Sequence, residues 1–381
     1  MTDYDAIVVG GGPGGSSAAR RLVAAGLRVV VVDAATFPRD KICAGWITPP
    51  VLSSLSLTPE MLSQAGLTLE PIVEFDTCLI GERLLRTTYT TPVSYGIRRR
   101  EFDRFLLERS GAALATGTRV TAIERSESQW VVNQTFRAPV LVGAGGHFCP
   151  VARAIDKAAE SRRHVVLAQE IEIPLSDETL SRAPARPEFH FCRDLGGYGW
   201  IFRKGRHLNV GFGRFASAGF PAATAAFKQG LAGRIDLPAE ALVPWKGHAY
   251  LIAPGGRPPT ADGCLLVGDA AGLAQSESGE GIRAAVESGL LAANAIVAAD
   301  GVYSRDRLAG YDAALAARFG HRQVADPSSP LAARVKRALA PLAMRSSLFV
   351  RHVVLDRWFL RAQMPSLALS PPMSQPRMEG V

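Results

Sequence analysis

A run of glycines near the N-terminus has the spacing of a phosphate-binding turn. The residues Gly10-Gly11-Gly12-Pro13-Gly14-Gly15 satisfy the pattern Gly-x-Gly-x-x-Gly, between a strand expected over residues 5–9 and a helix expected over residues 14–25. The first glycine of such a turn allows the tight bend, the second lets the backbone approach a pyrophosphate, and the third lets helix and strand pack closely. The amides at the helix N-terminus then stabilise the phosphate charge.

An acidic residue follows at the distance that a dinucleotide site requires. Asp33 ends a second apolar strand, expected over residues 28–32, and stands 18 residues after Gly15. A carboxylate there accepts hydrogen bonds from ribose hydroxyls, which favours FAD or NAD over a nucleotide with a 2′-phosphate. Strand, helix, second strand and acid together predict a dinucleotide site. The alternative is a glycine-rich turn that binds no nucleotide.

A second motif distinguishes FAD from NAD. Residues 265–272 (Leu-Leu-Val-Gly-Asp-Ala-Ala-Gly) and 278–282 (Ser-Gly-Glu-Gly-Ile) closely resemble the second FAD fingerprint of flavoprotein monooxygenases and geranylgeranyl reductases. The resemblance implies that Gly268 and Asp269 end a buried strand and that Asp269 holds the ribityl and pyrophosphate end of FAD. It also implies that the loop at Gly279 leads to helix amides near Gly281 and Ile282 that face the flavin.

A third motif lies between these two, and one position departs from the pattern. Residues 99–103 fit the Arg-x-x-Phe-Asp helix start of the same proteins, which places Arg99 near the cofactor. Three motifs in the expected order predict FAD. Residues 143–146, however, stand where these proteins usually carry Gly-Ala-Asp-Gly, and Gly145 replaces the acid. In the monooxygenase branch that acid is linked to FAD and NAD(P)H contacts, so the departure weakens the expectation of direct nicotinamide binding.

Two further segments resemble the geranylgeranyl reductase family in particular. Residues 198–202, continuing to 209–213, are similar to that family's Tyr-x-Trp-x-Phe-Pro strand and the Asn-Val-Gly-x-Gly that follows, with Arg203 in place of the proline. Residues 41–45 (Lys-Ile-Cys-Ala-Gly) resemble the Lys-x-Cys-Gly-Gly segment near the flavin ring. The resemblance covers residues 1–320 and identifies the chain as a member of this family, related to the para-hydroxybenzoate hydroxylase-like monooxygenases.

The same segments supply the candidate catalytic and binding residues. Cys43 is expected to donate a proton to a carbon being reduced or to tune the flavin's surroundings, and the alternative is a small buried hydrophobe. Trp200 and Phe202 are expected to line an apolar substrate tunnel, with plain core packing as the alternative. The catalytic candidates are Cys43, Trp200 and Tyr198, and the cofactor candidates are Gly10, Gly12, Pro13, Gly14, Gly15, Asp33, Lys41, Cys43, Ala44, Arg99, Gly268, Asp269, Gly279, Gly281 and Ile282.

Neither the cysteines nor the histidines suggest a metal or a disulfide framework. The five cysteines are widely scattered and the seven histidines show no ligand spacing, so we expect no metal. The N-terminus has no basic leader and no apolar run is long enough to span a bilayer, so a cytoplasmic location is expected.

The charge of +8 is concentrated near the C-terminus. Residues 332–363 carry seven basic side chains and one acid, which is +6 of that total, interleaved with apolar residues. Such a segment is either a helical layer with a solvated basic face or a site of peripheral contact with an anionic membrane. No nucleic-acid-binding motif accompanies the charge. The sequence does not indicate an oligomeric state.

The patterns together predict an α/β fold. We expect a doubly wound, Rossmann-like FAD domain from residues 1–70, 96–160 and 255–325, and an inserted antiparallel substrate sheet from 71–95 and 161–254. Within that sheet a hairpin is expected to turn at residues 203–206. Residues 326–364 are expected to be helical, and 365–381 to form a flexible tail.

The expected function is FAD-dependent reduction of carbon–carbon double bonds in an apolar, isoprenoid-like substrate. Reduced FAD would deliver a hydride to one carbon, and Cys43 or a water would protonate the other. Because one dinucleotide fingerprint is present, the reductant would be NAD(P)H bound transiently at the flavin or a protein electron donor. One alternative is an FAD-dependent monooxygenase that hydroxylates or epoxidises a small organic substrate. A second is a non-catalytic, flavin-stabilised binding or redox-sensing protein.

Overall fold

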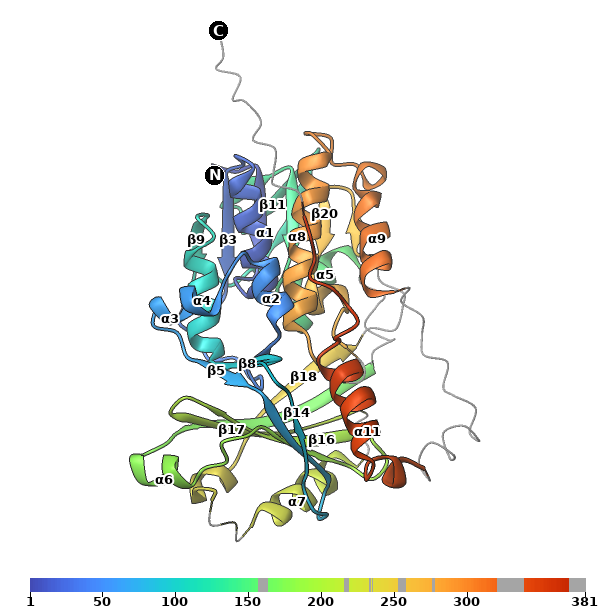
Figure 1. Ribbon diagram of the computed structural model, residues 1–381. Coiled ribbons are helices and arrows are strands. Elements are labelled where there is room, and N and C mark those ends of the chain that lie inside the picture. The colour runs from blue at the N-terminus through green and yellow to red at the C-terminus, as the bar shows by residue number, and fades with distance from the viewer. Residues whose placement is uncertain are drawn as a thin grey trace.

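The computed structural model describes residues 1–156, 164–215, 219–232, 234, 236–252, 258–275, 278–320 and 339–369. Two large sheets, one above the other in Figure 1, organise this part of the chain. A doubly wound α/β unit holds the upper sheet, and a largely antiparallel sheet forms the lower layer. The expected fold class is confirmed.

The upper sheet has six strands in the order β19-β20-β13-β2-β3-β9, and its five strands from β20 to β9 are parallel. Its core strands are continuous apolar runs, as expected for strands buried on both faces. The strands are β2 (Ala6–Val9), β3 (Val29–Asp33), β9 (Ala113–Thr116), β13 (Val140–Gly143), β19 (Thr260–Ala261) and β20 (Cys264–Leu266).

Helices and a small sheet cover this six-stranded sheet. Helix α1 (Pro13–Ala24) packs against α8 (Ile282–Ala298), which packs against α9 (Arg305–Phe319). A four-stranded sheet packs against β13 and β2 and consists of β1 (Thr2–Asp3), β10 (Ile123–Ser126), β11 (Gln129–Val132) and β12 (Phe136–Ala138). The shorter helices are α2 (Pro49–Ser54), α3 (Pro59–Gln64), α4 (Arg99–Glu108), α5 (Pro150–Ile155) and the 3₁₀ turns η1 (Gly146–Phe148) and η4 (Gly268–Ala271).

The lower sheet has seven strands in the order β18-β14-β17-β16-β15-β6-β7, and only its β15–β6 pair is parallel. Its strands are β6 (Glu74–Leu79), β7 (Leu85–Thr88), β14 (His164–Pro174), β15 (Glu188–Phe191), β16 (Gly197–Lys204), β17 (His207–Phe215) and β18 (Lys246–Ile252). A three-stranded sheet of β4 (Trp46–Ile47), β5 (Leu69–Ile72) and β8 (Ser94–Ile97) lies between the two layers.

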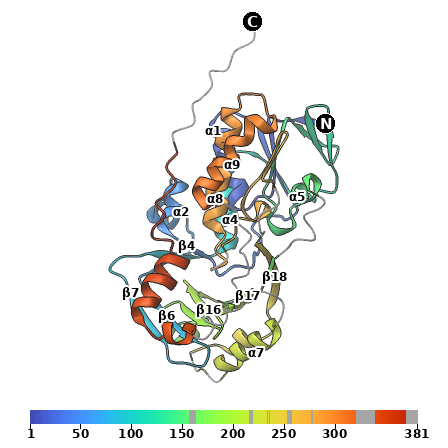
Figure 2. The same ribbon diagram turned by 90° about the vertical axis from the view of Figure 1, so that its right-hand side faces the viewer.

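Apolar side chains cover both faces of the lower sheet. Helix α7 (Phe220–Leu231) packs on the face away from the upper sheet, as Figure 2 shows, and α6 (Asp177–Arg182) and the 3₁₀ turn η3 (Ala239–Leu242) accompany it. On the other face, α11 (Ser347–Phe349) leads into a π-helix, η5 (Val350–Phe359), whose Val350, Val354 and Phe359 pack on the aromatic side chains of the sheet.

The hairpin turn is tighter than the pattern indicated. β16 continues to Lys204 and β17 begins at His207, so the turn consists of Gly205 and Arg206 alone, and the expectation of a turn over 203–206 was wrong. Lys204 extends the strand because its side chain is fully buried and paired with Glu172.

The C-terminal segment returns to the upper layer after η5. The carbonyl oxygens of Met364 and Pro365 accept hydrogen bonds from Arg283 Nη2 at 2.9 and 2.8 Å, and Leu367 packs against α2 and α8 side chains. Residues 326–338 of the expected helical segment and 370–381 of the expected tail lie outside the described residues. Within the part that is described, no helix is both long and apolar enough to cross a membrane.

Candidate functional site

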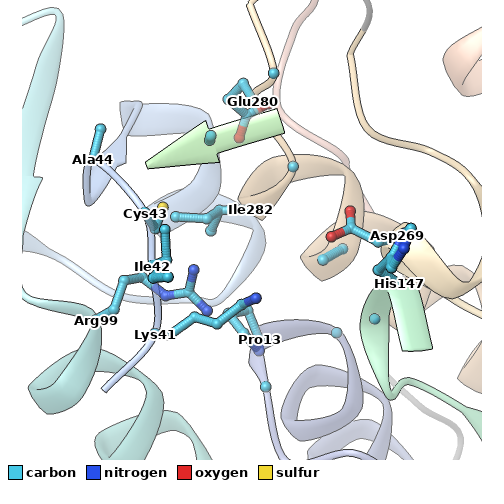
Figure 3. A pocket seen from close by; sticks show the side chains of 18 of the residues that line it. Pro13, Lys41, Ile42, Cys43, Ala44, Arg99, His147, Asp269, Glu280 and Ile282 are labelled. Atoms are coloured by element: carbon cyan, nitrogen blue, oxygen red, sulfur yellow. The ribbon is translucent and has the colours of Figure 1, made fainter. Parts of the chain in front are cut away.

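A cavity of about 380 Å³ opens between the upper and lower sheets. Of the sequence-predicted site residues, every one except Gly15 and Phe202 lines it, although they come from segments as far apart as Gly10 and Ile282. Figure 3 shows Lys41, Cys43 and Arg99 on one side and Asp269 and His147 on the other. The volume of the cavity lies within the usual range for small-molecule sites.

The glycine turn forms one end of the cavity, and its close contacts explain its composition. A Cβ at Gly15 would lie 1.9 Å from the carbonyl oxygen of Gly10, and one at Gly10, where φ is +113°, would lie 2.4 Å from the carbonyl oxygen of Ala144. Gly15 is therefore buried in the strand–helix contact and does not line the cavity. At Gly12 a Cβ would meet only Arg39 Nη2, at 3.5 Å, so the Gly12 backbone is open to a ligand.

Asp33 lies beside this turn at the end of β3. Its two oxygens accept hydrogen bonds from the backbone N–H groups of Gly11, at 2.7 Å, and Ala35, at 2.8 Å. These bonds hold the carboxylate toward the cavity, and each oxygen keeps a further lone pair. The arrangement suits acceptance of hydrogen bonds from ribose hydroxyls.

The second fingerprint forms the opposite wall. Gly268 has φ +56° and its N–H donates to Ser288 Oγ at 2.9 Å, which binds the turn to α8. Burial raises the pKa of Asp269, and the positive charges of Lys41 and Arg99 oppose that rise. Helix α8 begins at Ile282 after Gly281, which has no side chain to cap it, and the Glu280 carboxylate accepts one amide of the first turn, the N–H of Arg283, at 2.7 Å. The positive end of the helix therefore lies at the cavity.

Three basic side chains give the cavity a positive region. Arg99 Nε and Nη2 each donate to the buried carboxylate of Asp103 at 2.7 Å, and Arg39 Nη2 lies 3.1 Å from the same carboxylate. Burial acts to lower the pKa of Arg99, but Asp103 and Cys43 outweigh it, so Arg99 stays charged. Burial, helped by Arg99, lowers the pKa of Lys41 to about 8. Arg39 Nη1 is buried without a hydrogen-bond partner among the described residues and is available to an anion.

Cys43 lies on the segment of residues 39–44, which lines one side of the cavity (Figure 3). Its N–H donates to Glu170 Oε1 at 2.6 Å, and its sulfur accepts from the N–H of Gly45 at 3.4 Å. Position 45 requires glycine, because its φ is +68° and a Cβ there would lie 2.2 Å from the carbonyl oxygen of Ile97. Cys43 is partly exposed, whereas the other four cysteines are buried.

Aromatic and small apolar side chains of the lower sheet complete the site. The Tyr198 hydroxyl donates to the carbonyl oxygen of Ser278, which links β16 to the loop before α8. The Trp200 ring lies over Gly211, where a Cβ would be 2.2 Å from the indole, and its Nε1 donates to Asn209 Oδ1 at 2.7 Å. These contacts explain why asparagine stands at position 209 and glycine at position 211. Phe202 does not line the cavity but packs in the core with Trp46 and Phe189.

The departure at Gly145 has a steric explanation. A Cβ there would lie 3.1 Å from Cys149 Cα and 3.3 Å from its sulfur, so an acidic side chain at 145 would require the turn at 146–150 to shift. Gly145 and Gly146 instead present backbone to the cavity. Among the described residues, no group of three or more His, Cys, Asp or Glu side chains is arranged to hold a metal ion.

About half of the residues that line the cavity were not predicted, and four residues in or beside it matter most here. Arg39 and Trp46 line the cavity, and Glu170 and Lys204 lie buried beside the Cys43 segment. A signal existed for Glu170: it shares one face of β14 with Val166, Ala168 and Glu172, and an acid that follows apolar residues on one strand face needs a partner.

The glycine turn, Asp33, the α8 terminus and the basic side chains fit the phosphates and ribose of a dinucleotide such as FAD. The same cavity is also lined by Trp46, Val166, Ala168 and Trp200, so part of its wall is apolar. Residues 8–39 match the NAD(P)-binding Rossmann-like domain model, which covers the first βαβ unit.

Three known proteins extend this similarity over most of the chain. A menaquinone reductase of Mycolicibacterium smegmatis is 30% identical over 317 residues, covering 77% of this chain and 76% of its own. A geranylgeranyl diphosphate reductase of Rhodobacter capsulatus is 29% identical over 317 residues, covering 77% and 75%. The crystal structure of a geranylgeranyl bacteriochlorophyll reductase-like protein from Thermoplasma acidophilum has a TM-score of 0.72 at 19% identity, covering 95% and 98%, and so shares the fold.

Motifs, site geometry and similarity over three quarters of the chain agree. The protein is an enzyme, and it belongs to the geranylgeranyl and menaquinone reductase family of FAD-dependent oxidoreductases.

Proposed function

We propose that this enzyme reduces carbon–carbon double bonds in an apolar, isoprenoid-like substrate. The observation that carries the proposal is that Cys43 lines the same cavity as the glycine turn and the aromatic side chains of Tyr198 and Trp200. The names of the relatives, reductases of menaquinone and of geranylgeranyl diphosphate, support the same substrate class. Bound FAD in its reduced form would supply the hydride for such a reaction.

The residues around the cavity have distinct roles in this proposal. Gly12 and the amides at the start of α8 bind phosphate and ring oxygens, and Lys41 stabilises negative charge on the reduced cofactor. Cys43 holds a proton at Sγ for the carbon that does not receive the hydride. Trp46 and Trp200 exclude water and orient the apolar chain.

The reductant is NAD(P)H or a protein electron donor in this proposal. The cavity has one dinucleotide cradle, and Gly145 replaces the acid that related monooxygenases use near the nicotinamide. Both features favour a donor that contacts the flavin transiently over one with a dedicated binding domain.

We also propose peripheral contact with a membrane, where an isoprenoid lipid would be found, for an otherwise cytoplasmic enzyme. Leu339, Leu342 and Leu348 are exposed by 56%, 64% and 69%, in the same segment as Arg345, which is exposed and pairs with Glu82, and the half-buried Arg351. Exposed apolar and basic side chains together suit an anionic bilayer surface. Sedimentation with anionic vesicles tests this contact.

Mass spectrometry of the product tests the proposed reaction. The FAD-loaded protein, reduced chemically without oxygen, is mixed with menaquinone or geranylgeranyl diphosphate. After any quinol has been reoxidised in air, we expect a product that is still heavier by two hydrogen atoms for each double bond reduced. A product that gains an oxygen atom, formed only in air, would support a monooxygenase instead.

Variants then test the role of Cys43. We expect Cys43→Ser to lower the rate of the reduction step by about 10²–10⁴-fold, the usual effect of losing a general acid, without loss of bound FAD. Cys192→Ser, at a buried cysteine outside the cavity, is the matched control. A Cys43→Ser enzyme with unchanged turnover would remove Cys43 from the mechanism.

A further inference from the structure

A buried polar cluster lies beside the Cys43 segment, on the face of the lower sheet that bounds the cavity. Val166 and Ala168 line the cavity, and Glu170 continues the same row of β14 side chains. Glu170 is 5% exposed, and the nearby Lys204 of β16 and Asn209 of β17 are fully buried. Three polar groups in such a place are costly unless they have a role or partners.

Glu170 contacts the segment above it directly. Its Oε1 accepts the N–H of Cys43 at 2.6 Å, a short bond for a backbone donor. Lys204 also lies against this segment, because a Cβ at Gly45 would be 2.7 Å from Lys204 Nζ. The hydrogen bond to Glu170 and the close packing of Gly45 on Lys204 therefore hold residues 43–45 against the lower sheet.

The same cluster contacts the aromatic wall. Asn209 accepts from Trp200 Nε1, and its amide lies close enough to Glu170 to stabilise the carboxylate. Neither Glu170 Oε2 nor Asn209 Nδ2 reaches a hydrogen-bond partner among the described residues. Glu170 is thus bonded to Cys43 and its neighbour Asn209 is bonded to Trp200.

The charges that face Glu170 come from every element around it. Lys204 on β16 favours its ionised form, and Glu172 on β14 opposes it. Lys204 Nζ lies 2.5 Å from Glu172 Oε2, and Arg98 also pairs with Glu172, at 3.1 Å, so the positive charge of Lys204 is shared. The cross-strand neighbour on β18, Lys246, is exposed to solvent. Burial is the largest effect and raises the pKa of Glu170 to about 7.

We propose that Glu170 is a positioning residue whose ionised carboxylate holds the Cys43 segment over the cavity, so that the placement of Cys43 depends on pH. The hydrogen bond from the Cys43 N–H is charge-assisted when Glu170 is ionised and weaker when it is protonated. The segment is then held more tightly above neutral pH than below it. An effect of this pH dependence on catalysis rests on the proposed function, whereas its effect on the position of the Cys43 segment does not.

Hydrogen exchange of the Cys43 amide tests the inference without any substrate. In the FAD-loaded wild type, protection relative to an unstructured peptide is expected to rise about tenfold between roughly pH 6 and pH 8, the difference between a charged and a neutral acceptor. Glu170→Gln keeps an acceptor but cannot ionise, so its protection is expected to be flat. Glu172→Gln leaves Glu170 able to ionise but removes a negative charge beside it, so its pH step is expected to remain and to move to lower pH.

Wild-type protection that does not change with pH, or a step that survives in Glu170→Gln, would overturn the inference. The wild-type profile needs no variant to fold. The proposed function is tested separately, because Cys43→Ser activity can fall whether or not the Cys43 amide shows this pH step.

Discussion

Substitution of Gly289 by alanine tests the closest helix contact in the structure. Gly289 lies inside α8, where a Cβ would be 2.2 Å from the carbonyl oxygen of Gly14 and 3.3 Å from the N–H nitrogen of Ala18. Such a contact requires α8 to move away from α1 by roughly 1 Å, since non-bonded heavy atoms prefer about 3.5 Å. Overpacking of this kind costs about 1–3 kcal/mol.

The expected result is a net loss of stability. Alanine is intrinsically better than glycine within a helix by about 1 kcal/mol, which offsets part of the overpacking cost. Because the Cβ would meet rigid backbone, the overpacking cost is taken from the upper part of its range, about 2–3 kcal/mol, so we expect Gly289→Ala to lower the free energy of unfolding by about 1–2 kcal/mol. Because Gly14 lines the cavity, movement of α1 is expected to weaken FAD binding as well.

Urea denaturation and FAD titration measure the two effects. The matched control is Gly310→Ala in α9, where a Cβ would meet no atom within 4 Å, so the helix preference alone is expected to raise stability by about 0.5–1 kcal/mol. If Gly289→Ala proved as stable as Gly310→Ala and bound FAD as the wild type does, the close α1–α8 contact and the reasoning from it would be wrong.

Two further predictions concern the basic side chains of the cavity. Because the pKa of Lys41 is lowered to about 8, Lys41 is charged below that pH and neutral above it; FAD titrations should show affinity falling as pH rises through about 8 in the wild type but not in Lys41→Met. Arg99→Gln leaves the fully buried carboxylate of Asp103 with Arg39 as its remaining charged partner, and is expected to lower the free energy of unfolding by about 3–5 kcal/mol in urea. Arg100→Gln, which loses only an exposed pair, should change it by less than about 1 kcal/mol, and equal losses in the two variants would refute the distinction.

The fold and the cofactor side of the site could be predicted from the sequence. The strand–turn–helix unit is local: its glycines are required by contacts such as Gly15 with Gly10, five residues apart, and Asp33 follows within the same βαβ unit. The sequence pattern also distinguishes the two kinds of strand: strands buried on both faces are continuous apolar runs, and strands with one apolar face alternate apolar and polar residues. These features depend on short stretches of chain, so they can be read before any packing is known.

Packing between distant segments decided the rest. Phe202 shares one face of its strand with Trp200 and Tyr198. It nevertheless lies in the core, because Trp46 and Phe189 cover it. Lys204 looked like a turn residue and is a buried strand residue, because Glu172 pairs with it across the sheet.

Glu170 is the clearest case of a residue that only the tertiary structure identifies. It stands 127 residues from Cys43, and the hydrogen bond between them exists because β14 places its side chain beneath the Cys43 segment. Local sequence patterns determine which turns, strands and helices form, since sterics and burial act over a few residues. The partners of a buried charge depend instead on strand register and on how the layers meet, which no local pattern contains.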